Sequence, residues 1–123
     1  MANLDVALKN AMQIEGAIGV ALVDYTSGMT LGVAGGSAEL DLTVAAAGNT
    51  DVVRAKIRTI EMLKLNDEIE DILITLGSQY HVIRPLTGRH GKGLFLYLML
   101  SKSRANLALA RHQLRTIEEN LEL

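Results

Sequence analysis

A loop with the sequence TGRHGKG (residues 87–93) sets three glycines among arginine, histidine and lysine, between two apolar runs. In nucleotide-binding loops, backbone N–H groups and the N-terminus of a following helix surround the phosphate. Here the residues after Gly93 form a β-like run, so the helix that these motifs require is missing. The sequence therefore predicts a hairpin turn in which Gly88, Gly91 and Gly93 have positive φ.

A second glycine-rich stretch, GVAGGS (residues 32–37), precedes an expected helix and could hold an anion at the helix N-terminus. The stretch contains no basic residue, and Ser37 suits the N-cap of that helix. We favour a structural turn at this position.

The other side chains that could do chemistry form no recognised pattern. His81, His90 and His112 lie on an expected strand, turn and helix, without the HxxxH or HxxE spacing of a metal site. There is no GxSxG motif and no evident serine–histidine–aspartate set. The acidic groups around Asp67 and Glu118 are expected to be solvated ends of elements. The sequence thus predicts no catalytic, cofactor-binding or metal-binding residue, no cofactor and no enzyme activity.

Composition narrows the class of protein. The 123 residues suit a single domain (1–123), and 49% hydrophobic against 21% charged residues indicates a globular chain. Aromatic residues make up only 3% and the net charge is -2, which argues against nucleic-acid binding. There is no cysteine, no signal-peptide pattern, and no apolar run of the roughly 18 residues needed to span a membrane. We expect a cytoplasmic protein without membrane insertion.

Apolar periodicity predicts three helices and five strands in the order α-β-β-α-β-β-β-α. Tight turns between consecutive strands favour a mostly antiparallel five-stranded sheet with helices on both faces, an α+β (α/β sandwich) fold. The last strand is apolar on both faces and should be central. Helices are expected at 3–14, 38–64 and from about 103, and strands at 17–26, 29–36, 67–77, 78–87 and 94–101.

Two of these elements suggest contact with another chain. The third strand begins with the charged DEIED and continues as the aliphatic ILITL, which would attract a second strand if it lay at a sheet edge. In the long helix, Gly48 follows three alanines, and such small residues could let another backbone approach closely. Alternatively, the helix begins only at Asn49 or Thr50.

Three stretches of the sequence resemble the roadblock/dynein-light-chain domain. They are GAIGVALVDYTSGMTLGVAGG, EIEDILITLGSQYHVIRPL and GKGLFLYLMLSKSRANLALAR, with an alanine-rich helix between the first two. The resemblance covers about residues 4–121 and depends on the order of elements and on the first hairpin, where Asp24 precedes Ser27-Gly28. It implies a profilin-like/roadblock architecture and a homodimer in which third strands pair edge to edge and second helices pack together.

The resemblance also implies which residues make contacts. The dimer interface would comprise Ile69, Ile72, Leu73, Ile74 and Thr75 of the strand with Ala46, Val53, Ile57 and Ile60 of the helix. The alternative is that these residues are monomer core. The exposed side of the second helix is the expected partner surface, with Arg54, Lys56, Arg58, Glu61 and Lys64, although an ordinary solvated face explains these charges equally well.

Prokaryotic members of the family resemble accessory proteins of Ras-like small GTPases, including the activating protein of the gliding-motility polarity GTPase. The resemblance therefore implies a non-enzymatic homodimeric signalling module that regulates or scaffolds such a GTPase. One alternative is a dynein-light-chain-like structural subunit that binds independently of nucleotide state. Another is a small-molecule sensor, which the few aromatic residues disfavour. An enzyme or nucleotide binder that uses Arg89 and Lys92 is least favoured.

Overall fold

The computed structural model describes residues 2–37, 40–88 and 91–123. The elements are α1 (Leu4–Met12), β1 (Ala17–Asp24), β2 (Met29–Gly35), α2 (Leu42–Met62), β3 (Ile72–Thr75), β4 (Gln79–Pro85), β5 (Leu94–Ser101) and α3 (Leu107–Asn120). The five strands form one antiparallel sheet in the order β2-β1-β5-β4-β3, with β5 central as predicted and β2 and β3 at the edges. The predicted α+β architecture is confirmed.

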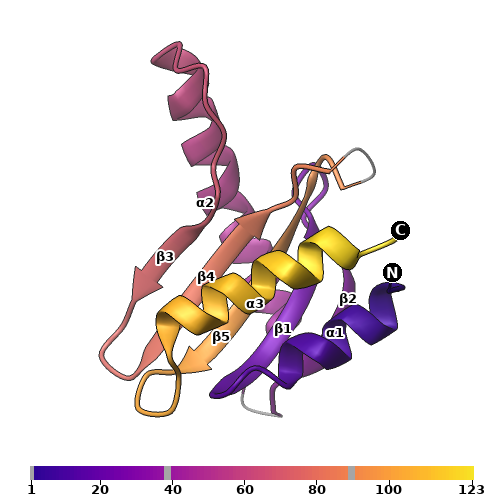
Figure 1. The fold of residues 1–123 in the computed structure, drawn as a ribbon. Helices are drawn as coiled ribbons and strands as arrows, with labels where there is room; N and C mark the ends of the chain where they lie inside the picture. The colour runs from indigo at the N-terminus through magenta and orange to yellow at the C-terminus, as the bar shows by residue number, and fades with distance from the viewer. Residues whose placement is uncertain (1, 38–39, 89–90) are drawn as a thin grey trace.

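Two apolar layers hold the helices to the sheet (Figure 1). The helices α1 and α3 lie side by side on one face, and α2 covers the other. Successive side chains of a strand point to opposite faces of the sheet, which creates both layers. In β5, Leu96 and Leu98 face α1 and α3, while Phe95 and Tyr97 face α2. Within the described part of the chain, no helix combines the length and apolar character needed to cross a bilayer.

The helix α2 begins at Leu42, and its N-cap is Asp41. The Oδ1 atom of Asp41 accepts the N–H groups of Thr43 at 2.9 Å and Val44 at 3.3 Å. The prediction of Ser37 as N-cap is therefore wrong. A carboxylate that occupies these N–H groups also disfavours an anion at this helix N-terminus.

The alternative start of α2 at Asn49 or Thr50 is wrong as well. The alanines before Gly48 are helical, and the buried Thr50 donates its hydroxyl to Ala46 O at 2.9 Å within the helix. The expected continuous helix is confirmed, with boundaries a few residues inside the predicted ones.

The strand β3 is shorter than the predicted 67–77. Its register pairs Ile72 with Ile83 of β4, so Glu70 falls opposite Pro85. Proline has no N–H to donate, and the ladder ends before it. The segment before β3 instead runs alongside α2, whose C-terminal half extends beyond the sheet (Figure 1).

The TGRHGKG loop joins β4 to β5, as the hairpin prediction requires, although Arg89 and His90 lie outside the described residues. Gly93 has a φ of 91°, as predicted, whereas Gly88 is not at positive φ, so the prediction for Gly88 is wrong. The prediction for Gly91 involves the backbone of His90, which lies outside the described residues. Gly91 serves packing, because a Cβ there would come within 2.7 Å of the Leu86 Cβ.

Candidate functional site

The strand β3 presents an open edge. On its outer side it pairs with no other strand in the described part of the chain. Ile72 and Ile74 are half-buried in the layer beneath α2, while Leu73 and Thr75 are exposed, Leu73 by 41%. The edge therefore combines free backbone hydrogen-bonding groups with aliphatic side chains, which favours pairing with another strand.

One side of α2 carries a stripe of small and apolar residues. Ala45, Gly48, Val52, Ala55 and Thr59 recur at alternating steps of three and four, so they share one side of the helix. Val52 is 38% exposed and Ala55 is exposed. A Cβ added at Gly48 would meet nothing within 4 Å, so packing within the chain does not require this glycine. The stripe leaves room for a closely packed helix.

An open hollow of about 670 Å³ joins the stripe to β3. Val52, Ala55 and Thr59 of α2 line one wall, and Ile69 and Ile72 line the other. The stripe, the hollow and the edge of β3 are thus continuous. We refer to them together as the α2–β3 surface.

Arginines hold the segment that forms the second wall of the hollow. Arg111 of α3 donates to both carboxylate oxygens of Asp71, at 2.7 and 3.0 Å, and Arg115 donates to Glu70 at 3.2 Å. Hydrogen bonding and the charge of Asp71 raise the pKa of Arg111. Arg84 of β4 donates to Glu70 O at 3.3 Å. The expectation of a solvated end is wrong for Asp71, whose side chain is 10% exposed, whereas Glu70 is exposed as expected.

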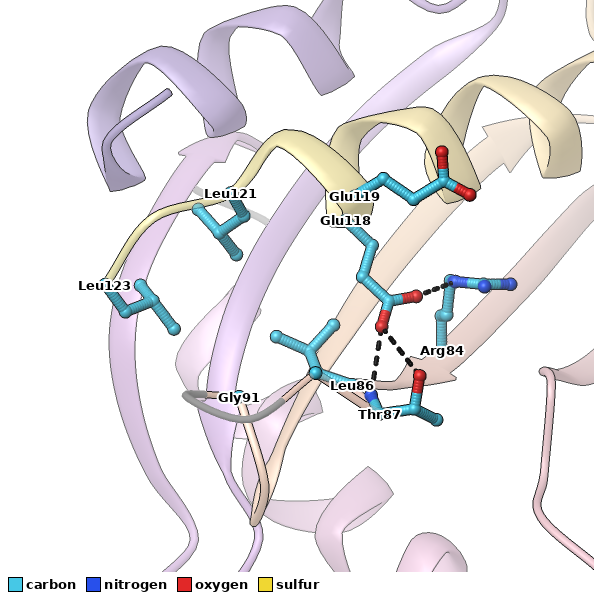
Figure 2. A pocket seen from close by; sticks show the side chains of 9 residues that line it. Arg84, Leu86, Thr87, Gly91, Glu118, Glu119, Leu121 and Leu123 are labelled. Atoms are coloured by element: carbon cyan, nitrogen blue, oxygen red, sulfur yellow. Dashed lines mark hydrogen bonds and ion pairs between the residues drawn. The ribbon is translucent and has the colours of Figure 1, made fainter. Parts of the chain in front are cut away.

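A partly buried ion pair joins β4 to the last turn of α3 (Figure 2). Arg84 Nε donates to Glu118, and the two side chains are 11% and 9% exposed. The same carboxylate accepts the Thr87 N–H at 2.9 Å, whereas Glu119 points away from the pair. A cavity of about 280 Å³ lies beside these residues. Glu118 is therefore a partly buried structural residue, contrary to the expectation of a solvated helix end.

His81 lies on the α2 face of the sheet, opposite Ile74 of β3. Its Nδ1 is 3.1 Å from the Tyr97 hydroxyl, and its Nε2 is 2.9 Å from Gln79 Oε1. Burial lowers the pKa of His81 and raises that of Tyr97, where a hydrogen bond with Asn49 opposes the increase. We interpret this histidine as a hydrogen-bonded residue of the sheet. Among the residues described, no group of three or more His, Asp or Glu side chains could hold a metal ion.

The structure separates the residues predicted for the dimer interface. Ile72–Thr75 form the β3 edge, and Ile69 lines the hollow before it. Ala46 and Val53 are 0% exposed and pack on the sheet, so their assignment to a helix contact is corrected. Ile57 and Ile60 are half-buried and line a cavity between α2 and the sheet. For α2, the predicted side is the one that covers its own sheet.

The α2 stripe was not predicted from the sequence, and it lies roughly 130° around the helix from the predicted residues. A signal was present, because Ala45, Gly48, Val52, Ala55 and Thr59 repeat at helical spacing and include the glycine already noted. The helix α2 therefore carries two apolar stripes, and only the tertiary structure shows which of them the sheet covers.

The charged residues predicted as a partner surface do not share one side of α2. Arg54 donates to Tyr25 O at 2.6 Å and to the next carbonyl oxygen, which fastens α2 to the first hairpin. Arg58 is exposed on the same flank, one turn later, whereas Lys56 lines the hollow next to β3. Glu61 lines the cavity beneath α2.

Lys64 follows Leu63, the C-cap of α2, and has a left-handed conformation with a φ of 55°. Its N–H donates to Glu61 O at 3.0 Å, and the Leu65 N–H donates to Ile60 O at 3.2 Å. This is the hydrogen-bond pattern of a Schellman motif, in which glycine is usual. Lys64 therefore has a backbone role in the helix end.

No protein-family model matches the sequence, and no curated protein matches it. Solved structures do. The chain is similar to a Roadblock/LC7 domain from Streptomyces avermitilis, with a TM-score of 0.80 and 12% identity over 96% of this chain and 93% of that one. It is similar to Myxococcus xanthus MglB, with a TM-score of 0.75 and 18% identity over 93% and 77%. A third similar structure is MglB with a tetrameric arrangement, with a TM-score of 0.65 and 14% identity over 94% and 87%. The chain therefore has the roadblock/LC7 fold, which confirms the architecture implied by the sequence.

Proposed function

We propose that this chain is a non-catalytic, homodimeric interaction module that regulates or scaffolds a Ras-like small GTPase. The observation that carries the proposal is the α2–β3 surface, an open aliphatic strand edge continuous with a stripe of small residues on a helix. On a roadblock/LC7 fold, this combination favours contact with proteins over catalysis. The proposal assigns no catalytic residue.

Self-association is the first part of the proposal. A second β3, antiparallel across a two-fold axis, would satisfy the open edge and join two five-stranded sheets. The same axis would bring the two α2 stripes together, where Gly48 and Ala55 permit a short distance between helices. Such a contact uses the same surface on both subunits and closes at a dimer. The tetrameric arrangement described for an MglB supports self-association in proteins of this fold.

The second part concerns the GTPase. Self-association would cover the stripe and Lys56, which lines the hollow, but would leave the opposite flank of each α2 open. Arg58 is exposed on this flank, and Arg54 fastens the flank to the first hairpin. We assign the partner contact to this flank, with Arg58 as its main charge. The resemblance of the sequence to accessory proteins of small GTPases supports the class of partner.

A binding experiment with a Ras-like GTPase from the same organism, loaded with GDP or a GTP analogue, tests this function. We expect binding that depends on the nucleotide state and that Arg58→Glu weakens by about tenfold, the effect of losing about 1.4 kcal/mol. Lys9→Glu, on exposed α1 at the other face of the sheet, is the matched control and should leave binding unchanged. Equal binding in both nucleotide states would favour the structural-subunit alternative, and no binding would contradict the proposal.

A further inference from the structure

A cavity of about 370 Å³ lies beneath the C-terminal half of α2. This part of the helix extends past the sheet (Figure 1). Ile57 and Ile60 of α2, Leu65 and Ile69 of the following segment, and Pro85 of β4 form its apolar part. The volume lies in the range of sites that bind small ligands or anchor side chains of a partner.

The polar residues around this cavity are mostly acidic. Among the described residues that line it, Glu61, Asp67 and Glu68 carry carboxylates and Lys92 carries an ammonium group. None of the three carboxylates forms an ion pair within the described part of the chain, although the next two acidic residues of the segment are both paired with arginines of α3. The cavity therefore has a negative potential that the described side chains only partly neutralise.

The C-terminal end of α2 brings the apolar and acidic residues of the cavity together. The Schellman motif at Lys64 turns the chain back, so Leu65 and Ile60 both line the cavity and the acidic segment follows directly. The two arginines of α3 hold the far end of that segment. The helix end therefore positions the apolar residues of the cavity, and the arginines of α3 position the far end of the acidic segment.

We propose that this cavity binds a partner protein through a short segment in which an apolar side chain lies next to basic ones. The apolar side chain would be buried among the isoleucines, and the basic groups would meet the carboxylates. Because carboxylates surround the cavity, a basic segment would bind there more favourably than an acidic one. The cavity shares only Ile69 with the hollow of the α2–β3 surface, so the inference does not depend on self-association.

A methyl NMR titration of the full chain with two matched peptides tests the proposal. The probes are acetyl-Gly-Arg-Leu-Arg-Gly-amide and the same peptide with glutamate in place of both arginines. We expect the basic peptide to shift the methyl signals of Ile57, Ile60 and Ile69. We also expect it to bind at least tenfold more tightly than the acidic peptide, because each of the three carboxylates would contribute part of a kcal/mol to the difference in binding free energy.

Variants of the acidic residues test whether the carboxylates around the cavity cause the preference for the basic peptide. The triple amide variant Glu61→Gln, Asp67→Asn, Glu68→Gln should reduce the affinity for the basic peptide about tenfold. A control triple variant removes the same number of charges on the α1 and α3 side, at the exposed Asp5, Glu119 and Glu122, and should retain the affinity. The methyl spectrum of each variant without peptide verifies that it is folded.

Three results would overturn the proposal. One is the absence of shifts at these methyl groups with millimolar basic peptide, and another is equal binding of the two peptides. The third is a dependence of the Ile57 and Ile60 signals on protein concentration without peptide, because a second copy of the chain would then occupy the cavity; Ile69 is left out of this criterion because it also lines the α2–β3 hollow. No GTPase is present in the titration, so its outcome is separate from that of the proposed function.

Discussion

Gly48 lies in the interior of α2, at a position where the surrounding chain does not explain it. Glycine in a helix costs about 1 kcal/mol relative to alanine. A Cβ at this position would have open space around it. A second helix that passes closely over the α2 stripe would account for a small residue here, which is the reason we place Gly48 in the α2–β3 surface.

Gly48→Ala should therefore have opposite effects on folding and on association. We expect the free energy of unfolding of the monomer to rise by about 1 kcal/mol, because alanine is the better helix former. The dimer should weaken, because the added methyl groups separate the two helices. Urea unfolding at low protein concentration measures the first effect, and sedimentation equilibrium measures the second. A variant that dimerises more tightly would contradict the placement of Gly48.

His81 makes stability depend on pH. Burial lowers its pKa below 6.5, so the unfolded chain binds a proton more readily than the folded one. The stability contribution of the neutral ring is complete above pH 6.5 and is lost as pH falls from 6.5 through the folded pKa, by at most about 1.4 kcal/mol per pH unit.

Urea unfolding of the wild type and of His81→Gln between pH 7.5 and 5.5 tests this linkage. We expect the wild type to lose more stability over this range than the variant, which retains a polar side chain beside Tyr97. The same dependence on pH in both proteins would show that other groups cause it.

At the scale of elements, the Arg84–Glu118 pair joins β4, the following loop and α3 (Figure 2). Both side chains are largely shielded from water, so removing one of them leaves the other charge without a partner. The cost of that unpaired charge exceeds the free energy that the intact pair contributes.

Glu118→Ala should reduce the free energy of unfolding by about 3 kcal/mol, because Arg84 and the Thr87 N–H lose their acceptor. Glu119→Ala is the matched control one residue later, on an exposed side chain, and should change stability by about 0.5 kcal/mol or less. Chemical unfolding of both variants measures the difference. Equal losses of unfolding free energy in the two variants would show that the Arg84–Glu118 pair contributes no more to stability than an exposed glutamate does.

The order and type of the elements could be predicted from the sequence because each has a clear apolar period. The central position of β5 followed from its apolar character on both faces, and its burial confirms the reasoning. The length of β3 could not be predicted in the same way, since the ladder stops where Pro85 falls in the register. The ion pairs of Asp71 and Glu118 also depend on side chains about 30 to 40 residues away in sequence.

The candidate site was predicted in part. The aliphatic edge of β3 could be recognised because its charged start and plain apolar run are local in sequence. The side of α2 that faces it could not, because the covered stripe at Ala46 and Val53 and the open stripe at Val52 and Ala55 are both apolar. Burial by the sheet distinguishes them, and this is a property of the tertiary structure.

At the scale of the whole molecule, the sheet has two open edges of different character. The edge at β3 is continuous with the small-residue stripe of α2, whereas the edge at β2 lies at the other end of the sheet. The β2 edge adjoins a hollow of its own beside α1. We expect association at β3, because there the open edge and its hollow adjoin a helix side made of small residues, which permits a short distance between helices. The opposite flank of α2 and the cavity beneath its end would then remain available to partners.

Size-exclusion chromatography with light scattering, at micromolar concentration, tests self-association through the α2–β3 surface most directly. We predict a wild-type mass of twice the 13.3 kDa of one chain. Ala55→Arg places a long charged side chain in the stripe and should give a single-chain mass, while Ala47→Arg, on an exposed alanine of another side of α2, should remain dimeric. A monomeric wild type, or an Ala55→Arg variant that stays dimeric, would contradict this account.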